Sequence, residues 1–201
     1  LSSESGDIGA WNINEDFQNI IEQNSEYNIP GRVVLSSCKS VPEVIYAAIG
    51  SGYINNMGFN LSHGNYIIKS INNGNTWEEV NLPTENGNEW ASLAWHALAV
   101  EVHPEDPEIV FVGGLELYRT TNGGNSWNNL SEWDLMYSGG GDRYVHADIH
   151  KVAFNPSNYN KAVITSDGGI FSSNNILDSW EQIVFNERNQ GYNTLQFYTC
   201  D

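Results

Sequence analysis

Short apolar runs alternate along the chain with turns rich in Gly, Asn, Pro and Asp. In three places such a turn leads into a β-branched run that ends at glycine, at 41–50, 104–113 and 156–168. A further strand-like stretch precedes each of these units, at 32–36, 97–102 and 151–154. Many short strands separated by tight turns predict an all-β fold.

A hairpin motif follows each unit: Ser or Thr, then Asn, Gly, Ser or Thr and Trp at fixed spacing. The first copy contains Ser70, Asn72, Gly74, Thr76 and Trp77. The second copy contains Thr120, Asn122, Gly124, Ser126 and Trp127. A third copy lacks the glycine, is one residue longer, and contains Ser172, Asn174, Ser179 and Trp180. The final tryptophans recur at intervals of about 50 residues, the length of a propeller blade.

One such period holds four expected strands, which predicts a β-propeller with four-stranded antiparallel blades. We expect three blades, at 31–83, 90–131 and 142–186, and the first strand of a further blade at 189–201. Three blades and one strand fall short of a closed ring. The expected partners are therefore the remaining blades of the same propeller, or another chain.

The segment 1–30 lacks the repeat and stands apart from the blades. Asn14 is a suitable N-cap, acidic residues follow it, and Phe17, Ile20 and Ile21 have helical spacing. This pattern predicts one short amphipathic helix that packs on the edge of a blade.

The hairpin motif resembles the Asp-box, also called the BNR repeat, Ser-x-Asp-x-Gly-x-Thr-Trp, with Asn here in place of Asp. A closer resemblance covers roughly 90–201, where the matching stretches are 95–104, 109–127, 144–150, 166–171 and 189–198. Those stretches, in this order, are similar to secreted bacterial propeller proteins of the sortilin-like or glycosyl-hydrolase-like type, which use type IX secretion.

The resemblance implies a secreted or cell-surface protein whose hairpin motifs are structural. It implies a role in binding, adhesion or scaffolding, with carbohydrate or secretion and surface proteins as partners. The leading hypothesis is therefore a non-enzymatic protein, and the alternative is part of a carbohydrate-active, glycoside hydrolase-like propeller enzyme.

Composition removes several other classes of function. The chain of 201 residues has 25 acidic and 8 basic side chains and a net charge of −17. Nucleic acid is therefore not an expected partner, because phosphate binding needs clustered Lys and Arg. No apolar run is long enough for a transmembrane helix. The two cysteines, Cys38 and Cys200, form either one disulfide or two buried thiols.

The sharpest chemical candidate is the run His146-Ala-Asp148-Ile-His150. In an extended strand these three polar side chains project from one face, and two imidazoles with a carboxylate suit a divalent metal ion. The same residues could instead form hydrogen bonds between neighbouring blades. Asp167, which precedes two glycines, is a second candidate for ligand binding.

Asp148 and Asp167 are also the candidate catalytic pair if the protein is a glycosidase, which needs two carboxyl groups. Glu101 and Glu116 are further carboxylates of the same standing. A sialidase is disfavoured, because such enzymes clamp a carboxylate with clustered arginines and this chain has only four. Aromatic residues that could stack on sugar rings, or pack between blades, are Trp90, Trp95, Trp133, Tyr137 and Tyr144.

Overall fold

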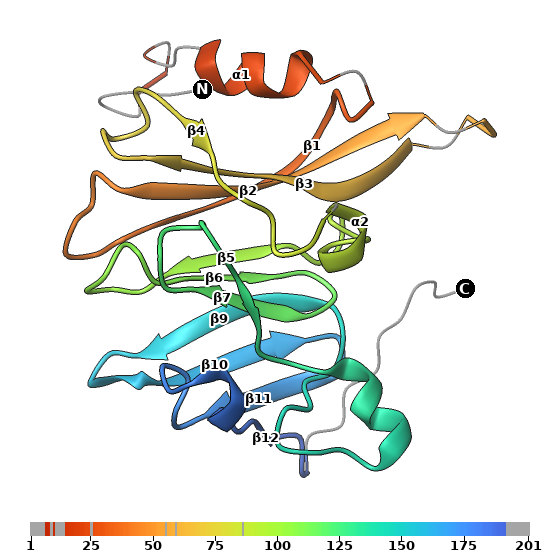
Figure 1. Cartoon of the computed structure of the whole chain (residues 1–201), viewed down its shortest axis with the longest axis vertical. Coiled ribbons are helices and arrows are strands. Elements are labelled where there is room, and N and C mark those ends of the chain that lie inside the picture. The colour runs from red at the N-terminus through yellow and green to blue at the C-terminus, as the bar shows by residue number, and fades with distance from the viewer. Residues whose placement is uncertain are drawn as a thin grey trace.

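The computed structural model describes residues 7–8, 10, 15–24, 26–54, 56–58, 60–85 and 87–191. Three antiparallel sheets of four strands each follow one another along the chain (Figure 1). The strands of the first sheet are β1 (Ile29–Ser37), β2 (Ile45–Ile54), β3 (Asn60–Ser70) and β4 (Glu78–Glu79). The strands of the second are β5 (Ala99–Val102), β6 (Val110–Gly113), β7 (Leu117–Thr120) and β8 (Asn128–Asn129). The strands of the third are β9 (Ile149–Asn155), β10 (Asn158–Ser166), β11 (Gly169–Ser173) and β12 (Asn186–Glu187).

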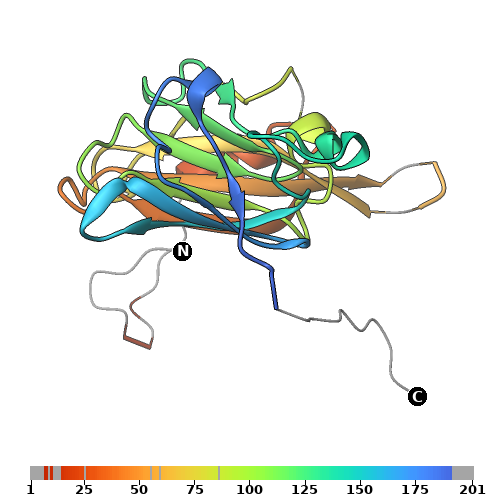
Figure 2. The ribbon, with the colours of Figure 1, turned by 90° about the horizontal axis from the view of Figure 1, so that it is seen from below.

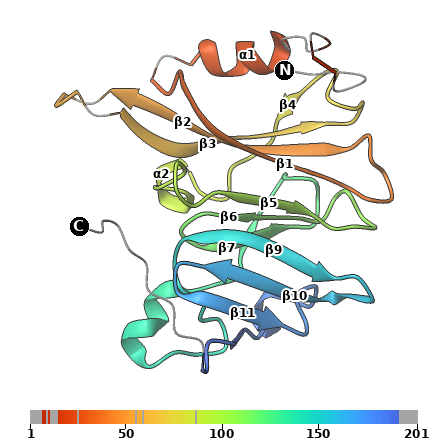
Figure 3. The same cartoon turned by 180° about the vertical axis from the view of Figure 1, so that it is seen from behind.

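The predicted all-β fold with four-stranded antiparallel blades is confirmed, and we call the three sheets blades 1, 2 and 3. Within each blade the strands pair in sequence order, so β1, β5 and β9 each stand at one edge. These three first strands lie beside one another, because β5 contacts both β1 and β9. Figure 3 shows the same stacking from behind, and Figure 2 shows the blades overlying one another when seen from below.

The hydrophobic core is divided between the faces of the blades, because alternate residues of a strand point to opposite sides. Between blades 1 and 2, Tyr46 and Ile67 pack against Val100 and Val112. Between blades 2 and 3, the core contains Phe111, Leu117, Ile149, Ile164 and Phe171. Blade 2 is therefore buried on both faces, which explains the unbroken apolar run Val110-Phe-Val112 of β6.

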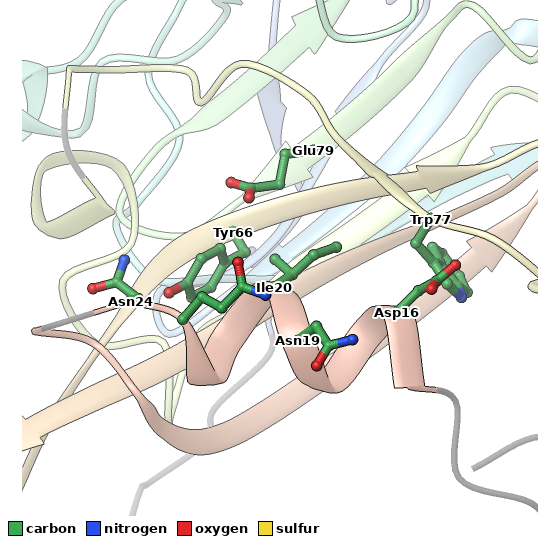
Figure 4. Close-up of a pocket in the computed structure, with 8 residues that line it drawn as sticks. Asp16, Asn19, Ile20, Asn24, Tyr66, Trp77 and Glu79 are labelled. Atoms are coloured by element: carbon green, nitrogen blue, oxygen red, sulfur yellow. The ribbon is translucent and has the colours of Figure 1, made fainter.

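The predicted N-terminal helix is present as α1 (Glu15–Glu22), which lies over the face of blade 1 that is turned away from blade 2 (Figure 1). Ile20 and Ile21 of this helix pack against Ile49, Tyr66 and Ile68 of the sheet. A groove remains beside the helix, where Ile20 faces Tyr66 and Trp77 (Figure 4). The expected N-cap Asn14 and the side chain of Phe17 lie outside the described residues.

The described residues also contain short helices: α2 (Gly87–Trp90) and two 3-10 helices, at Trp133–Ser138 and Trp180–Gln182. None of the helices in the described part of the chain is both long and apolar enough to cross a membrane. Most of the stretch 189–201, including Cys200, lies outside the described residues. The further blade and the pairing of Cys38 therefore stay predictions. Cys38 itself is buried beside the carbonyl oxygen of His103.

The first hairpin motif is closed by its own side chains. Asn72 Oδ1 accepts hydrogen bonds from the Thr76 amide at 2.9 Å and from Ser70 Oγ at 3.0 Å, while Asn72 Nδ2 donates to Thr76 Oγ1. Ser70 Oγ also accepts from the amide of Gly74, whose φ of 80° is the left-handed conformation that glycine tolerates best. The motif therefore makes a rigid turn between β3 and β4.

The second motif repeats these bonds, with Thr120, Asn122 and Ser126 in the same places. The third copy is shifted by one residue from the alignment that the sequence suggests. Ser173 Oγ donates to Asn175 Oδ1, and the Asn175 amide donates back to Ser173 Oγ. The expected Ser172 and Asn174 do not take these places, because Ser172 accepts a bond from Arg188 and Asn174 is exposed. In this register the third copy has the same spacing as the other two, from Ser173 to Trp180, with Leu177 in place of the glycine. The expected additional residue is therefore wrong, because it came only from starting the alignment at Ser172.

Candidate binding site at the ends of the first strands

Two imidazoles and one carboxylate converge from three separate segments of blades 2 and 3. His96 Nε2 lies 3.1 Å from each carboxylate oxygen of Asp167. His150 Nε2 lies 2.6 Å from Asp167 Oδ1. The two imidazole rings meet edge to face, with their centroids 5.1 Å apart. We call these three residues the His-Asp cluster.

The cluster is partly open to solvent. The exposed fractions of the side chains are 25% for His96, 33% for His150 and 21% for Asp167. This exposure leaves the three groups accessible to a ligand, yet each is held by its neighbours. A site of this kind can exchange a bound ligand with solvent.

The loop before β5 positions His96. The amide of His96 donates to the carbonyl oxygen of Leu93 at 2.8 Å, which closes a tight turn. The carbonyl oxygen of His96 accepts a hydrogen bond from the guanidinium of Arg32 on β1. Blade 1 therefore helps to fix a residue that acts at the junction of blades 2 and 3.

His150 lies in an irregularity of β9. Lys151 pairs with Thr165 and Ile149 pairs with Ser166, so β9 has one residue more than β10 across this step. Such a β-bulge turns a side chain away from the regular alternation of the strand. The bulge accounts for how His150 reaches Asp167, which follows β10 directly.

The backbone of Asp148 holds Asp167 in place. The amide of Asp167 donates to the carbonyl oxygen of Asp148, and the amide of Asp148 donates to the carbonyl oxygen of Leu115. Asp148 adopts a φ of 65°, a left-handed conformation that Asp tolerates better than most residues. These bonds connect the start of blade 3 to both the β10–β11 turn and blade 2.

The expected common face of His146, Asp148 and His150 is not formed. β9 begins only at Ile149, and the left-handed turn at Asp148 breaks the extended backbone before it. His146 instead bonds to the carbonyl oxygen of Ala147 through Nδ1, and its ring lies against Gly168, where a Cβ atom would collide with it. Among the described residues, the potential metal ligands that converge are His96, His150 and Asp167.

The two carboxyl groups of this region have opposite electrostatic environments. Burial, followed by the charge of Asp167, raises the pKa of Asp148 above its usual range. Burial would also raise the pKa of Asp167, but hydrogen bonds from His150 and His96 outweigh it and lower that pKa. Asp167 is therefore the carboxylate that the cluster keeps charged.

An exposed tryptophan stands next to the cluster. Trp95 is 64% exposed, and its ring centroid lies 5.4 Å from that of His96. The other aromatic candidates differ in their surroundings. Trp90 is fully buried and donates to the carbonyl oxygen of Gly64, so it is not a surface platform. Tyr144 packs on Phe171, and Trp133 pairs with the exposed Tyr137.

The two further carboxylates serve other contacts. Glu101 on β5 forms a salt bridge of 2.7 Å with Lys151 on β9, which joins the first strands of blades 2 and 3. Glu116 is buried, and burial raises its pKa to about 7. It accepts hydrogen bonds from Ser131 Oγ and from the amide of Trp133. Glu116 thus anchors the segment that leaves blade 2.

Sequence reasoning did not identify His96. Its ring acts with residues more than 50 positions away, and only the repeat offers a signal for this. His96 precedes His150 by about one blade length, so both stand near the start of a first strand. The two residues are not equivalent positions, because His96 lies three residues before β5 whereas His150 is the second residue of β9. The two imidazoles meet because blades 2 and 3 are stacked.

Comparisons with known proteins support the fold alone. No protein-family model matches the chain, and no curated protein matches it in sequence. Among solved structures, a GH74 enzyme from Niastella koreensis matches 79% of this chain with 22% identity and a TM-score of 0.53. An ancestral GH74 enzyme matches 81% of it with 24% identity and a TM-score of 0.49. The matches cover only 23% and 19% of those two proteins.

A third match, YCF48 from Cyanidioschyzon merolae, has 12% identity over 75% of this chain and 53% of that protein, with a TM-score of 0.38. The chain thus spans about a fifth of the length of the GH74 structures. Together with the three four-stranded antiparallel blades, the match to the Niastella enzyme shows that the chain has a partial β-propeller fold.

Proposed function

We propose that the chain is a segment of a β-propeller protein that binds carbohydrate at the His-Asp cluster, in an adhesion or scaffold role. The observation that carries this proposal is the exposed Trp95 beside three polar side chains that accept and donate hydrogen bonds. A sugar ring can stack on an aromatic face while its hydroxyl groups bond to such neighbours. The Asp-box character of the hairpins and a secreted or surface location belong to the same proposal.

Affinity electrophoresis with soluble polysaccharides, xyloglucan included, tests this proposal. Retention of the wild-type chain is expected for at least one polysaccharide. Trp95→Ala should weaken retention by about 5- to 150-fold, if the stacked ring contributes about 1–3 kcal/mol, as aromatic side chains do when they stack on nucleic-acid bases. Tyr137→Ala is the matched control, since Tyr137 is an exposed aromatic residue outside the cluster. Absence of retention on every polysaccharide, or equal loss in both variants, would contradict carbohydrate binding at this site.

A glycoside hydrolase is the second candidate function. The observation in its favour is the backbone bond from Asp167 to Asp148, which holds two carboxyl-bearing residues together beside the exposed Trp95. A glycosidase needs two such groups on either side of the bond it cleaves. Release of new reducing ends from a retained polysaccharide, abolished in both Asp148→Asn and Asp167→Asn, would favour the enzyme over the binding protein. Retention without cleavage favours binding alone.

A further inference from the structure

We propose that the His-Asp cluster is a binding site for a divalent transition-metal ion such as Zn²⁺ or Co²⁺. This inference goes beyond carbohydrate binding and does not depend on it, because it concerns the three polar groups without Trp95. The sequence pattern points to a different set of ligands, His146, Asp148 and His150. In the folded chain the residues that converge with His150 are His96 and Asp167, instead of His146 and Asp148.

The first argument is geometric. The potential ligand atoms of His96, His150 and Asp167 all lie within 4.8 Å of one another. In a tetrahedral zinc site with bonds of about 2.0–2.1 Å, neighbouring ligand atoms are about 3.3 Å apart. The distance from His96 Nε2 to Asp167 Oδ1, 3.1 Å, is close to this value. His150 Nε2, at 2.6 Å from the same oxygen, needs to withdraw by less than an ångström.

The second argument concerns ligand chemistry. Two imidazole nitrogens and one carboxylate oxygen favour Zn²⁺, Co²⁺ and related ions over Ca²⁺ and Mg²⁺, which prefer oxygen ligands. Three protein ligands leave at least one coordination position open, as in metal sites that bind an exchangeable ligand. The partial exposure of all three side chains gives an ion a way in from solvent.

The third argument is that residues outside the cluster hold its ligands in position. The backbone of Asp148 fixes Asp167, and Arg32 fixes the carbonyl group of His96. Partners of this kind outside the ligand set orient metal ligands and contribute to affinity. The hydrogen bonds that now join the imidazoles to Asp167 also show that the three groups already face one another. An ion would replace these bonds rather than gather distant side chains.

Titration of the full chain with Co²⁺ tests the proposal, because bound Co²⁺ gives visible absorption bands that report its coordination. One equivalent is expected to bind with nitrogen and oxygen ligation. His96→Ala, His150→Ala and Asp167→Asn should each weaken binding by more than the roughly 10- to 100-fold that loss of an outer partner costs. His146→Ala is the matched control, and its Co²⁺ spectrum should match that of the wild type.

Three results would overturn the proposal. The first is no saturable binding to the wild type. The second is binding that survives His96→Ala but is lost in His146→Ala, which would return the site to the ligands suggested by the sequence. The third is equal binding in all variants, which would mean an adventitious ion only. Circular dichroism spectra show whether each variant is folded.

A second measurement needs no variant and so does not depend on folding of the mutants. Acylation of the five histidines of the wild type by diethyl pyrocarbonate, followed by peptide mass spectrometry, should be slowed by Zn²⁺ at His96 and His150 but not at His63. Unchanged acylation of His96 would contradict the site. Polysaccharide retention measured with and without a chelator separates the two proposals. Retention that persists in the chelator means that carbohydrate binds without a metal ion, and the metal site is then tested by the Co²⁺ titration alone.

Discussion

At the scale of single residues, the hairpin motif depends on the asparagine at its centre. In the second copy, Asn122 Oδ1 accepts from Thr120 Oγ1 at 2.8 Å and from the Ser126 amide at 2.9 Å, while Nδ2 donates to Ser126 Oγ at 2.9 Å. An aspartate would keep both accepted bonds, because it has the same oxygen at that place. The donated bond would reverse, because the hydroxyl of Ser126 can turn and donate to the second carboxylate oxygen. We therefore expect an amide and a carboxylate to serve equally well at this position.

Two substitutions test this equivalence. Asn122→Ala should lower the free energy of unfolding by about 1–2 kcal/mol, because the Ser126 amide and the Thr120 hydroxyl lose their acceptor. Asn122→Asp should change it by less than about 0.5 kcal/mol. Urea unfolding followed by tryptophan fluorescence measures both. An aspartate variant as unstable as the alanine variant would show that the Nδ2 donor is essential.

Glu116 gives the molecule a pH-dependent stability. Its pKa of about 7 in the folded state exceeds the ordinary value of 4.5, so the folded chain holds this proton more tightly than the unfolded chain. Stability from this group is fully present at low pH and is lost as the pH rises from about 4.5 to about 7. Glu116→Gln removes the dependence while keeping an oxygen that can accept from the Trp133 amide.

The stability of Glu116→Gln relative to wild type should therefore increase by about 2 kcal/mol between pH 5.5 and pH 8.5. Thermal and urea unfolding across this range measure the difference. Glu85→Gln, which removes an exposed glutamate, is the control for the change in net charge. The same increase in both variants would assign the effect to net charge rather than to Glu116.

At the scale of elements, side chains from one blade close the loops of the next. Arg119 on β7 donates from Nη1 to the carbonyl oxygen of Ile176 at 2.6 Å and from Nη2 to that of Asp178 at 2.8 Å. Its side chain is buried between blades 2 and 3. Trp127 and Asn81 connect blades 2 and 1 in a similar way, because Trp127 Nε1 donates to the carbonyl oxygen of Asn81.

Arg119→Met should lower the free energy of unfolding by about 2–4 kcal/mol, because the buried carbonyl group of Ile176 and the partly buried one of Asp178 lose a charged donor. Arg188→Met is the matched control, since Arg188 is an exposed residue that bonds to Ser172 within blade 3. It should cost less than about 1 kcal/mol. Urea unfolding measures both variants, and equal costs would mean that the bonds between blades contribute little.

The repeat made the strands and blades predictable, because each blade has its own turn residues and apolar runs. The site was less predictable, because it depends on departures from regular strands. The left-handed backbone of Asp148 and the bulge at His150 change which side chains share a face, and the alternation of polar and apolar residues indicates neither. Asp167 was identified from its place before two glycines. His96 was missed, because its role appears only when consecutive blades are stacked.

At the scale of the whole molecule, the described residues form an arc of three stacked blades (Figure 1). Helix α1 covers the outer face of blade 1, whereas Ala153 and Val163 are exposed on the outer face of blade 3. Further blades as partners stay a prediction. The stacking of blades 2 and 3 is what brings His96 to His150 and Asp167, so the site is a product of the arc rather than of any one blade.

The most direct test of this arrangement is a long-range proton–nitrogen NMR spectrum of the histidine side chains in wild type and Asp167→Asn. His96 and His150 both contact Asp167 through Nε2, so the Nε2 signals of both should shift in the variant. The signals of His63 and His103 should stay in place, because these residues bond elsewhere or lie in the core. A shift of His150 with an unchanged His96 would show that blades 2 and 3 do not meet at this site.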